Sequence, residues 1–326
     1  MSIEVRRVQR LGASSLVVTI PKEWARRLGL EAGSRVYLID EGDSVRIVPL
    51  SKSSGEPPEF VAPPIPKAAG DMVVCIYLSG LSEARIKLRG PLAGEALMAL
   101  KERALSLLGV QVGESEDGAA VVKVALDSEK LDVPHMIRVL ARDAEGILGI
   151  LSRIVERGGS SEEDLRELEV LERDFLRNQH AIIRYLMTRR AGTPNLVANY
   201  YAALATGYLG FAVDLLDNMV KLLPEQGGLT LQAEEASRIK GLLSRLVELI
   251  SLEARIIANP SFTRAGELIA ELSSLRGEVR ELISGSPSPW AAVVLAKIHD
   301  VLRVLTLSAY VTLCMAVISS AGRGKH

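Results

Sequence analysis

Six basic side chains near the start of the chain have the types and spacing to bind a polyanion. Only Glu4 and Glu23 oppose them within the first 30 residues, so this segment carries a local excess of positive charge. Guanidinium and ammonium groups pair with phosphate oxygens, and DNA is the usual polyanion for such a cluster. The sequence therefore predicts a DNA-binding surface, and the alternative is a solvated basic face without a ligand. The predicted DNA-binding residues are Arg6, Arg7, Arg10, Lys22, Arg26 and Arg27.

The rest of the chain does not share this basic character. Lys and Arg number 39 against 40 Asp and Glu, which gives a formal net charge of −1. A general nucleic-acid binder would be basic overall. Any binding must therefore come from a local surface.

Catalytic chemistry is not indicated elsewhere. The histidines share no ligand-like spacing with cysteine or with one another, and adjacent His299 and Asp300 diverge on a helix. No nucleophile elbow and no glycine-rich phosphate loop stand in the sequence. We predict that the protein is not an enzyme, with no catalytic residue and no cofactor. The four histidines are His135, His180, His299 and His326.

The two cysteines, Cys75 and Cys314, lie far apart in apolar segments. They are predicted to be reduced, buried residues and not a disulfide pair. The first ten residues are polar and charged, so no signal peptide is expected. These features favour a cytoplasmic protein.

The segment that positions the basic residues has a clear order of elements. Two extended apolar stretches flank a turn at Gly12, Pro21 ends the second stretch, and a short amphipathic helix ends at Leu28-Gly29. A turn at Gly33-Ser34 and a closing hairpin follow. Residues 3–49 thereby resemble the AbrB-type, swapped-hairpin, MazE-like DNA-binding domain. The resemblance implies that two chains interleave their hairpins into one dimeric barrel, with the basic residues facing DNA.

One departure from that family concerns the first turn. Bacterial members commonly carry Gly-Arg there, whereas this chain has Ser14-Ser15. The change puts direct reading of bases in doubt more than contact with phosphates. We therefore expect mainly backbone contacts.

The chain is long enough, at 326 residues, for several domains. Five of the 14 prolines fall within residues 51–70, which predicts a semi-rigid linker without strand or helix interior. It would separate a DNA-binding domain at 1–50 from a small α/β segment at 71–128. In that segment we predict strands at 72–78, 84–88 and 119–126 and a helix at 92–108.

From Asp132 onward the pattern is helical, and an apolar content of 48% with only 4% aromatics indicates an aliphatic core. Asp132 is a predicted N-cap, Gly158-Gly159 a stop, and Ser161 with Asp164 a capping box. Two triplets of long helices indicate a duplicated three-helix bundle, at 129–226 and 227–326. The predicted helices cover about 132–157, 161–190, 194–223, 231–258, 263–284 and 289–319.

Together with two short segments, this duplicated triplet resembles the archaeal PhoU-type phosphate-uptake regulator family. The segments are Val74–Gly80, with a Tyr-x-x-Gly pattern, and Leu107–Val112, with a Leu-x-Gly-hydrophobic pattern. The resemblance implies a transcriptional regulator of phosphate uptake whose helices sense or dock a partner, such as a phosphate transporter or a signalling kinase. Two alternatives remain: an adaptor that dimerises through its first domain without binding DNA, and an antitoxin-like module.

Bundles of that family often hold iron or zinc through Glu/Asp-x-x-x-Asp motifs. Here Glu172 matches a first acid, but Leu176 stands at the second, and the other two motifs fall on 207–212 and 302–307 without acids. We therefore predict no bound metal. Neighbouring acids are interpreted as solvated helix faces: Glu169, Glu172, Asp174, Asp214, Asp217, Glu278 and Glu281.

Two stretches, 191–213 and 304–321, contain no charged residue. Each is close to the roughly 20 residues of a membrane span. Polar residues interrupt both, and both belong to the helical repeat. We expect them to be buried in the bundle or in a dimer interface, with no membrane span; membrane insertion and docking to a transporter are the alternatives.

Overall fold

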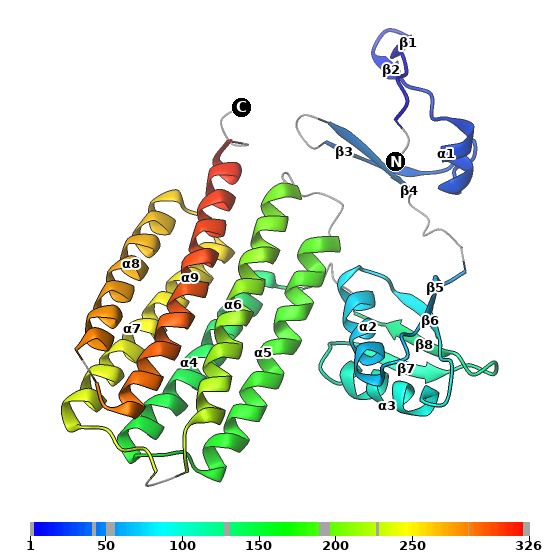
Figure 1. Cartoon of the computed structure of the whole chain (residues 1–326). Coiled ribbons are helices and arrows are strands. Elements are labelled where there is room, and N and C mark those ends of the chain that lie inside the picture. Colours follow the sequence, from blue (N-terminus) through cyan, green and yellow to red (C-terminus); the bar gives the residue numbers. More distant parts are fainter. Residues whose placement is uncertain are drawn as a thin grey trace. The chain divides into compact units, whose positions relative to one another are not determined.

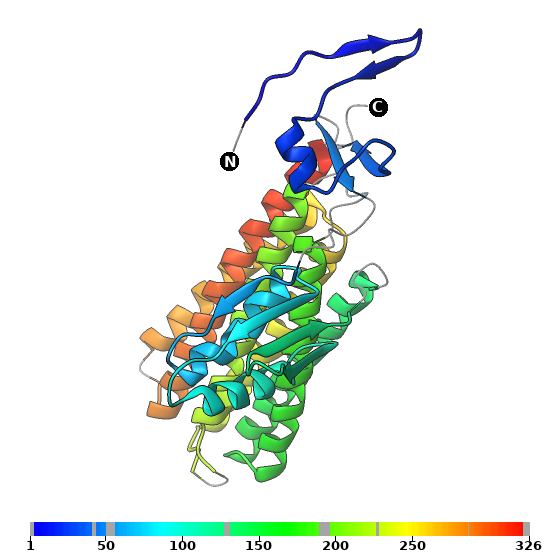
Figure 2. The ribbon, with the colours of Figure 1, turned by 90° about the vertical axis from the view of Figure 1, so that its right-hand side faces the viewer.

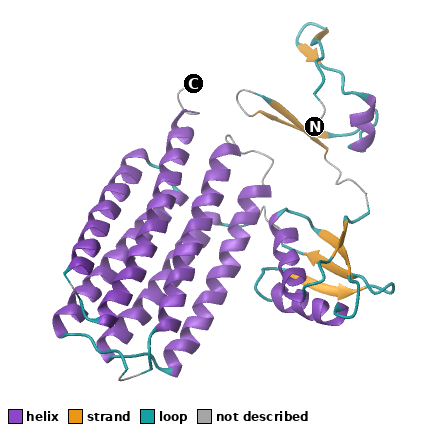
Figure 3. Cartoon of the chain, viewed as in Figure 1, coloured by secondary structure: helices purple, strands orange, loops and turns teal. Residues whose placement is uncertain are grey.

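The computed structural model describes residues 3–40, 44–49, 56–126, 131–188, 196–225, 228–285 and 287–321. The chain divides into two compact units, Met1–Glu56 and Pro57–His326, which we call the head and the body (Figure 1). The head is small and strand-rich, and the body is mostly helical (Figure 3).

The head consists of two antiparallel hairpins and one short helix. Strands β1 (Gln9–Leu11) and β2 (Ser15–Val17) form the first hairpin, and β3 (Val36–Asp40) and β4 (Val45–Pro49) the second. Helix α1 (Lys22–Arg27) lies between them in sequence. Glycines at φ of 69° and 63° make the first turn and end α1, conformations that side chains with a Cβ rarely adopt (Gly12, Gly29).

The two hairpins are separate two-stranded sheets within one chain. Hairpin β1–β2 projects away from α1 and from β3–β4 in both views (Figures 1 and 2). Each of its strands is only three residues long, shorter than the extended stretches that the sequence suggests. A closed barrel is therefore not formed by a single chain.

The body begins with an α/β layer. Its elements are β5 (Glu59–Val61), α2 (Pro66–Leu78), β6 (Glu83–Lys87), α3 (Ala93–Ala104), β7 (Val110–Glu114) and β8 (Ala120–Val124). The sheet order is β5-β6-β8-β7, with β5 parallel to β6 and the other pairs antiparallel. Alternate residues of β6 and β8, such as Ile86 and Val122, are buried in a small core that includes Val73 of α2 and Leu100 of α3.

Two predictions for this region are wrong. Residues 72–78 form the second half of helix α2 and not a strand, because Pro66 provides a helix start that lengthens a short apolar run into a helix of 13 residues. The stretch 51–70 also contains β5 and the first turns of α2, so it is not free of regular structure. Residues 51–55 of that stretch lie outside the described chain. Strand β7 was not predicted.

The six long helices agree with the sequence interpretation: α4 (Val133–Arg157), α5 (Glu162–Thr188), α6 (Leu196–Leu222), α7 (Ala233–Ala258), α8 (Phe262–Ser284) and α9 (Pro289–Ala321). The Asp132 carboxylate accepts a hydrogen bond from the backbone N–H of His135 at 3.0 Å, and Gly158 ends α4 at φ 80°. The predicted N-cap and stop are thereby confirmed. The predicted start of the third helix at Thr193-Pro194 lies outside the described residues.

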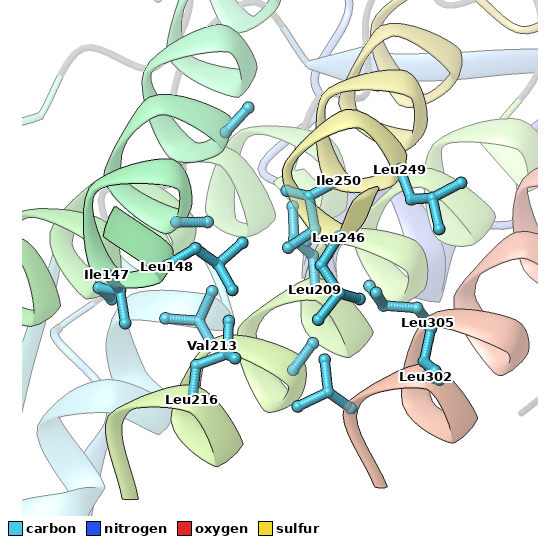
Figure 4. Close-up of a cluster of buried hydrophobic side chains, with 14 of the residues drawn as sticks. Ile147, Leu148, Leu209, Val213, Leu216, Leu246, Leu249, Ile250, Leu302 and Leu305 are labelled. Atoms are coloured by element: carbon cyan, nitrogen blue, oxygen red, sulfur yellow. The ribbon is translucent and has the colours of Figure 1, made fainter. Parts of the chain in front are cut away.

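One aliphatic core joins all six helices. Figure 4 shows its centre, where Leu148 of α4, Leu209 of α6, Ile250 of α7 and Leu305 of α9 converge. Helix α6 packs on α9, and α4 packs on α7, so the two triplets meet along two helix pairs. The helices thus form one six-helix bundle, and the proposed domain limits stay a prediction.

The α/β layer is fixed to the bundle through Arg184 of α5. Its guanidinium donates hydrogen bonds to the carbonyls of Tyr77, Gly80 (3.3 Å) and Leu81 (3.2 Å), at the C-terminal end of α2. It also lies over the Tyr77 ring, 4.9 Å from the centroid. A cation at this helix end satisfies carbonyls that have no partner in the helix. The Tyr-x-x-Gly segment therefore forms a helix end and not a strand.

Candidate nucleic-acid interface

Helix α1 presents three of the six predicted basic residues on the surface of the head. Lys22 and Arg26 lie one turn apart on one face, and Arg27 follows directly; all three side chains are exposed. Trp24 and Ala25 are half-buried on the opposite side. The helix therefore turns its apolar side toward the head and its cations toward solvent.

The other three basic residues belong to the first hairpin. Arg10 stands in β1 opposite Leu16, whereas Arg6 and Arg7 precede the strand; all three are exposed. Arg6 pairs with the nearby Glu4, an exposed contact that contributes little. Within the described part of the chain, the other five predicted residues form no ion pair, so their charges are available to a ligand.

A single chain does not bring the two basic groups together. The hairpin that carries Arg10 stands apart from the helix that carries Lys22 and Arg26 (Figures 1 and 2). The sequence interpretation also missed Arg35, an exposed residue just before β3. Counting charge over the whole head, and not over its first 30 residues, would have included it.

The head lacks a hydrophobic core of its own. None of its described side chains is buried, and Leu16, Leu38 and Val45 are each about 70% exposed, at 72%, 69% and 68%. Domains of this size cannot bury enough apolar surface alone, and exposed apolar side chains in such number indicate a partner surface. The head of a single chain therefore leaves an apolar surface uncovered.

Comparison with known proteins bears on this unit. Residues 9–55 match the family model described as antidote-toxin recognition MazE, bacterial antitoxin. The match supports an AbrB/MazE-like N-terminal domain, a kind of domain that typically binds DNA and dimerises. It fits either a DNA-binding or an antitoxin-like role. No curated protein and no solved structure matches the chain.

The match covers the head alone. The resemblance of the helices to PhoU-type regulators therefore stays a prediction, as does the archaeal origin that it implied.

The part of the chain that the structure describes shows no metal-binding cluster. No group of three or more His, Cys, Asp or Glu side chains there could hold a metal ion. Burial, and then the charge of Arg103, lower the pKa of His180 to about 4, so this imidazole is neutral. His299 is remote from it in sequence and accepts a hydrogen bond from Arg280 at 3.3 Å.

Two predictions about single side chains are wrong. Cys75 and Cys314 are exposed and not buried, because each falls on the outer face of a helix whose apolar neighbours point inward. Asp217 is not solvated: its side chain is 3% exposed and accepts a hydrogen bond from Lys221 at 2.7 Å. Lys221 also bridges to Glu172 at 3.2 Å. Burial is the main cause that raises the pKa of Asp217.

Helices α6 and α9 are long and apolar enough to cross a membrane. Such a finding for two helices is weak evidence, because core helices of soluble bundles have the same length and composition. In their most apolar windows, 39% and 50% of the residues are buried. Much of each window therefore faces outward.

Proposed function

We propose that this protein is a DNA-binding transcriptional regulator that binds DNA through a homodimeric head. The proposal is carried by two observations together: five exposed cations that form no ion pair within the described residues, and the match of residues 9–55 to the MazE family model. A ligand for these cations must be anionic and extended, since they lie on both a hairpin and a helix. Duplex DNA has that chemistry.

The dimer follows from the missing core. A head whose Leu16, Leu38 and Val45 are exposed gains stability when a second chain covers them. Interleaved hairpins would place β1 of one chain beside elements of its partner. Such an arrangement would combine the cations of β1 and α1, which a single chain keeps apart, into one surface.

We propose that most contacts are made with phosphates. Lys22, Arg26 and Arg27 are flexible cations on a helix of only six residues, too short to lie along a groove. Ser14-Ser15, at the end of the first turn and the start of β2, stand where bacterial members of the AbrB-type family that the head resembles commonly have Gly-Arg. Sequence reading by base contacts would then be limited, and the binding constant would fall steeply with salt.

The body would act as the sensor or docking part of the regulator. On the strength of the PhoU-type resemblance, we place it in the control of phosphate uptake, with a transporter or signalling protein as partner. We further propose a cytoplasmic location, no enzymatic activity, no resident cofactor and no membrane span. The single core of α4–α9 and the Arg184 junction support a body that moves as one unit.

Salt-titrated binding to mixed-sequence duplex DNA tests the DNA contact. We expect the Arg26→Ala/Arg27→Ala variant to bind about 10- to 100-fold more weakly near 0.1 M salt, with a salt slope lower by about one per lost phosphate contact. The matched control is Arg138→Ala/Arg142→Ala, which removes two exposed arginines from α4. Equal affinities for both variants would exclude the assigned face.

Two other roles for the head predict different outcomes. An adaptor that only dimerises would leave DNA unprotected while co-purifying with a membrane complex. An antitoxin-like role is favoured by the printed description of the matching family. It predicts that co-expression of this chain relieves the growth arrest caused by a toxin encoded beside it, and that the Arg26→Ala/Arg27→Ala variant still does so.

A further inference from the structure

One face of the six-helix bundle is uncovered and apolar. Helix α6 exposes an apolar side chain every three or four residues in its first half, and α9 does the same in its second half. Phe211 is 63% exposed, Tyr310 53% and Leu307 51%. We call this surface the α6–α9 face; it comprises Val197, Tyr200, Leu204, Phe211, Leu307, Tyr310, Cys314 and Val317.

These side chains lie on one side of the molecule. The Ser308 hydroxyl donates a hydrogen bond to the carbonyl of Ala205 at 3.2 Å, which aligns the middle of α6 with the middle of α9. The two helices run in opposite directions, with α4 and α7 behind them (Figure 1). Because α4 and α7 cover the inner faces, the exposed stripes of α6 and α9 point to the same outer side.

The face carries no charge. No Lys, Arg, Asp or Glu occurs in 191–213 or in 304–321, the stretches that contain all eight residues. A continuous apolar surface across two helices is larger than the scattered apolar side chains that water tolerates. Exposed aromatic residues with charges excluded are the composition of an interface core. Something therefore covers this face.

A lipid bilayer does not fit as the cover. Helices α5 and α8, which flank α6 and α9 in the bundle, expose charged residues along their lengths, which would be placed in hydrocarbon if the bundle spanned a membrane. Binding in the plane of a membrane surface uses Lys and Arg beside the apolar side chains. The α6–α9 face has neither. The flanking charges include Arg166, Arg173, Glu267 and Glu271.

We infer that the α6–α9 face binds the same face of a second copy of this chain. Across a two-fold axis residue i of one copy contacts residue j of the other and j contacts i, and only residues at the axis meet their own copies. An uncharged apolar face meets this condition without burying an unpaired charge, so it is complementary to itself. The head already needs a second chain. Pairing there raises the effective concentration of one body for another. The inference does not depend on DNA binding.

The test distinguishes head–head pairing from pairing of the α6–α9 faces. The mass of the assembly formed by the full chain is measured by sedimentation. Leu16→Asp/Leu38→Asp places charges in the exposed apolar surface of the head and gives the background in which only the body can pair. In this background we expect a dimer that Leu204→Glu/Tyr310→Glu weakens by at least about tenfold. The matched control is Val170→Glu, the same kind of change on an exposed position of α5. Circular dichroism checks that each variant is folded.

A folded head variant that stays monomeric at tens of micromolar, or that dimerises equally well with both face substitutions, would overturn the inference. So would binding of phosphatidylcholine vesicles by that monomer, which would assign the face to lipid. Failure of the unmodified chain to bind DNA, with the body dimer intact, would count against the proposed function alone.

Cys314 offers a second readout in the native chain. Both cysteines are exposed, but only Cys314 belongs to the face. A short bis-maleimide should link two copies of Cys75→Ser through Cys314 and leave Cys314→Ser unlinked. The reverse pattern would contradict the assignment.

Discussion

Glu253 is the least expected residue in the body. It lies on α7 with its side chain fully buried, and neither carboxylate oxygen has a hydrogen-bond partner within the described structure. On α4, Leu151 is buried and is likewise followed three and four residues later by a buried aliphatic pair, so a leucine suits this kind of core position. Burial raises the pKa of Glu253 to about 8.

The raised pKa predicts how stability depends on pH. The folded chain keeps this proton between pH 4.5 and about 8, whereas the unfolded chain releases it, so folding loses stability as pH rises through that window. Glu253→Gln removes the loss. We expect the free energy of unfolding of the variant, relative to that of the wild type, to rise by roughly 1 kcal/mol per pH unit between pH 4.5 and about 8. Above that window the difference should stay constant.

Denaturant unfolding at pH 5 to 9 measures this difference. Glu248→Gln, an exposed position on the same helix, is the matched control and should follow the wild type at every pH. Glu253→Leu should also flatten the curve. If the free energies of unfolding of the wild type and of Glu253→Gln change in parallel with pH, the pKa of this carboxyl is the same in the folded and the unfolded chain.

The sequence could not identify Glu253 as buried. Acids are rarely buried, and this one stands among other acids and arginines of α7 that face water. Asp217 was misassigned for the same reason. In the sequence, the only indication of burial is that each acid stands where the 3.6-residue period of its helix predicts an apolar residue. For a single residue this indication is weak.

At the scale of elements, helix starts were the most predictable features. The start of α5 is a capping box: Asp164 accepts a hydrogen bond from the backbone N–H of Ser161 at 2.9 Å, and the Ser161 hydroxyl accepts one from the N–H of Asp164 at 3.2 Å. Arg157 and Arg153 pair with the same carboxylate. Burial alone would raise the pKa of Asp164, but the Ser161 hydrogen bonds and the two arginines outweigh it and lower the pKa.

A lowered pKa means that Asp164 stabilises the fold above pH 3.8 and that its contribution is lost as pH falls through the folded value. We expect Asp164→Asn to lower the free energy of unfolding by about 2 kcal/mol at pH 7. The cost should shrink as pH falls below 3.8 and through the lowered folded pKa, where the wild-type carboxylate becomes protonated. Exposed Glu163→Gln, in the same turn, serves as the control. A cost that does not change with pH would mean that shape, and not charge, matters here.

Elements without such caps were harder to predict. Met72–Leu78 is too short and too uniformly apolar for its period to separate strand from helix, and only the proline six residues earlier indicates the helix. Strand β7 was not predicted, because Gly113 interrupts its apolar pattern and the strand begins shortly after α3 ends.

At the scale of the whole molecule, the clustering of basic residues predicted a basic surface, and the order of the turns predicted the small N-terminal head. The sequence could not place the cations relative to one another, because in the dimer that we propose a second chain completes the head. The same limit applies to the α6–α9 face: the uncharged stretches were visible, but only the packing of α6 on α9 shows that their exposed sides coincide.

Hydrogen–deuterium exchange of the full chain, with and without duplex DNA, tests the central claim most directly. The account predicts slower exchange on DNA binding in residues 5–11 and 22–29, which carry the six cations, and little change on the outer faces of α5 and α8. Protection confined to the body, or an unchanged head under conditions where DNA is bound, would contradict it.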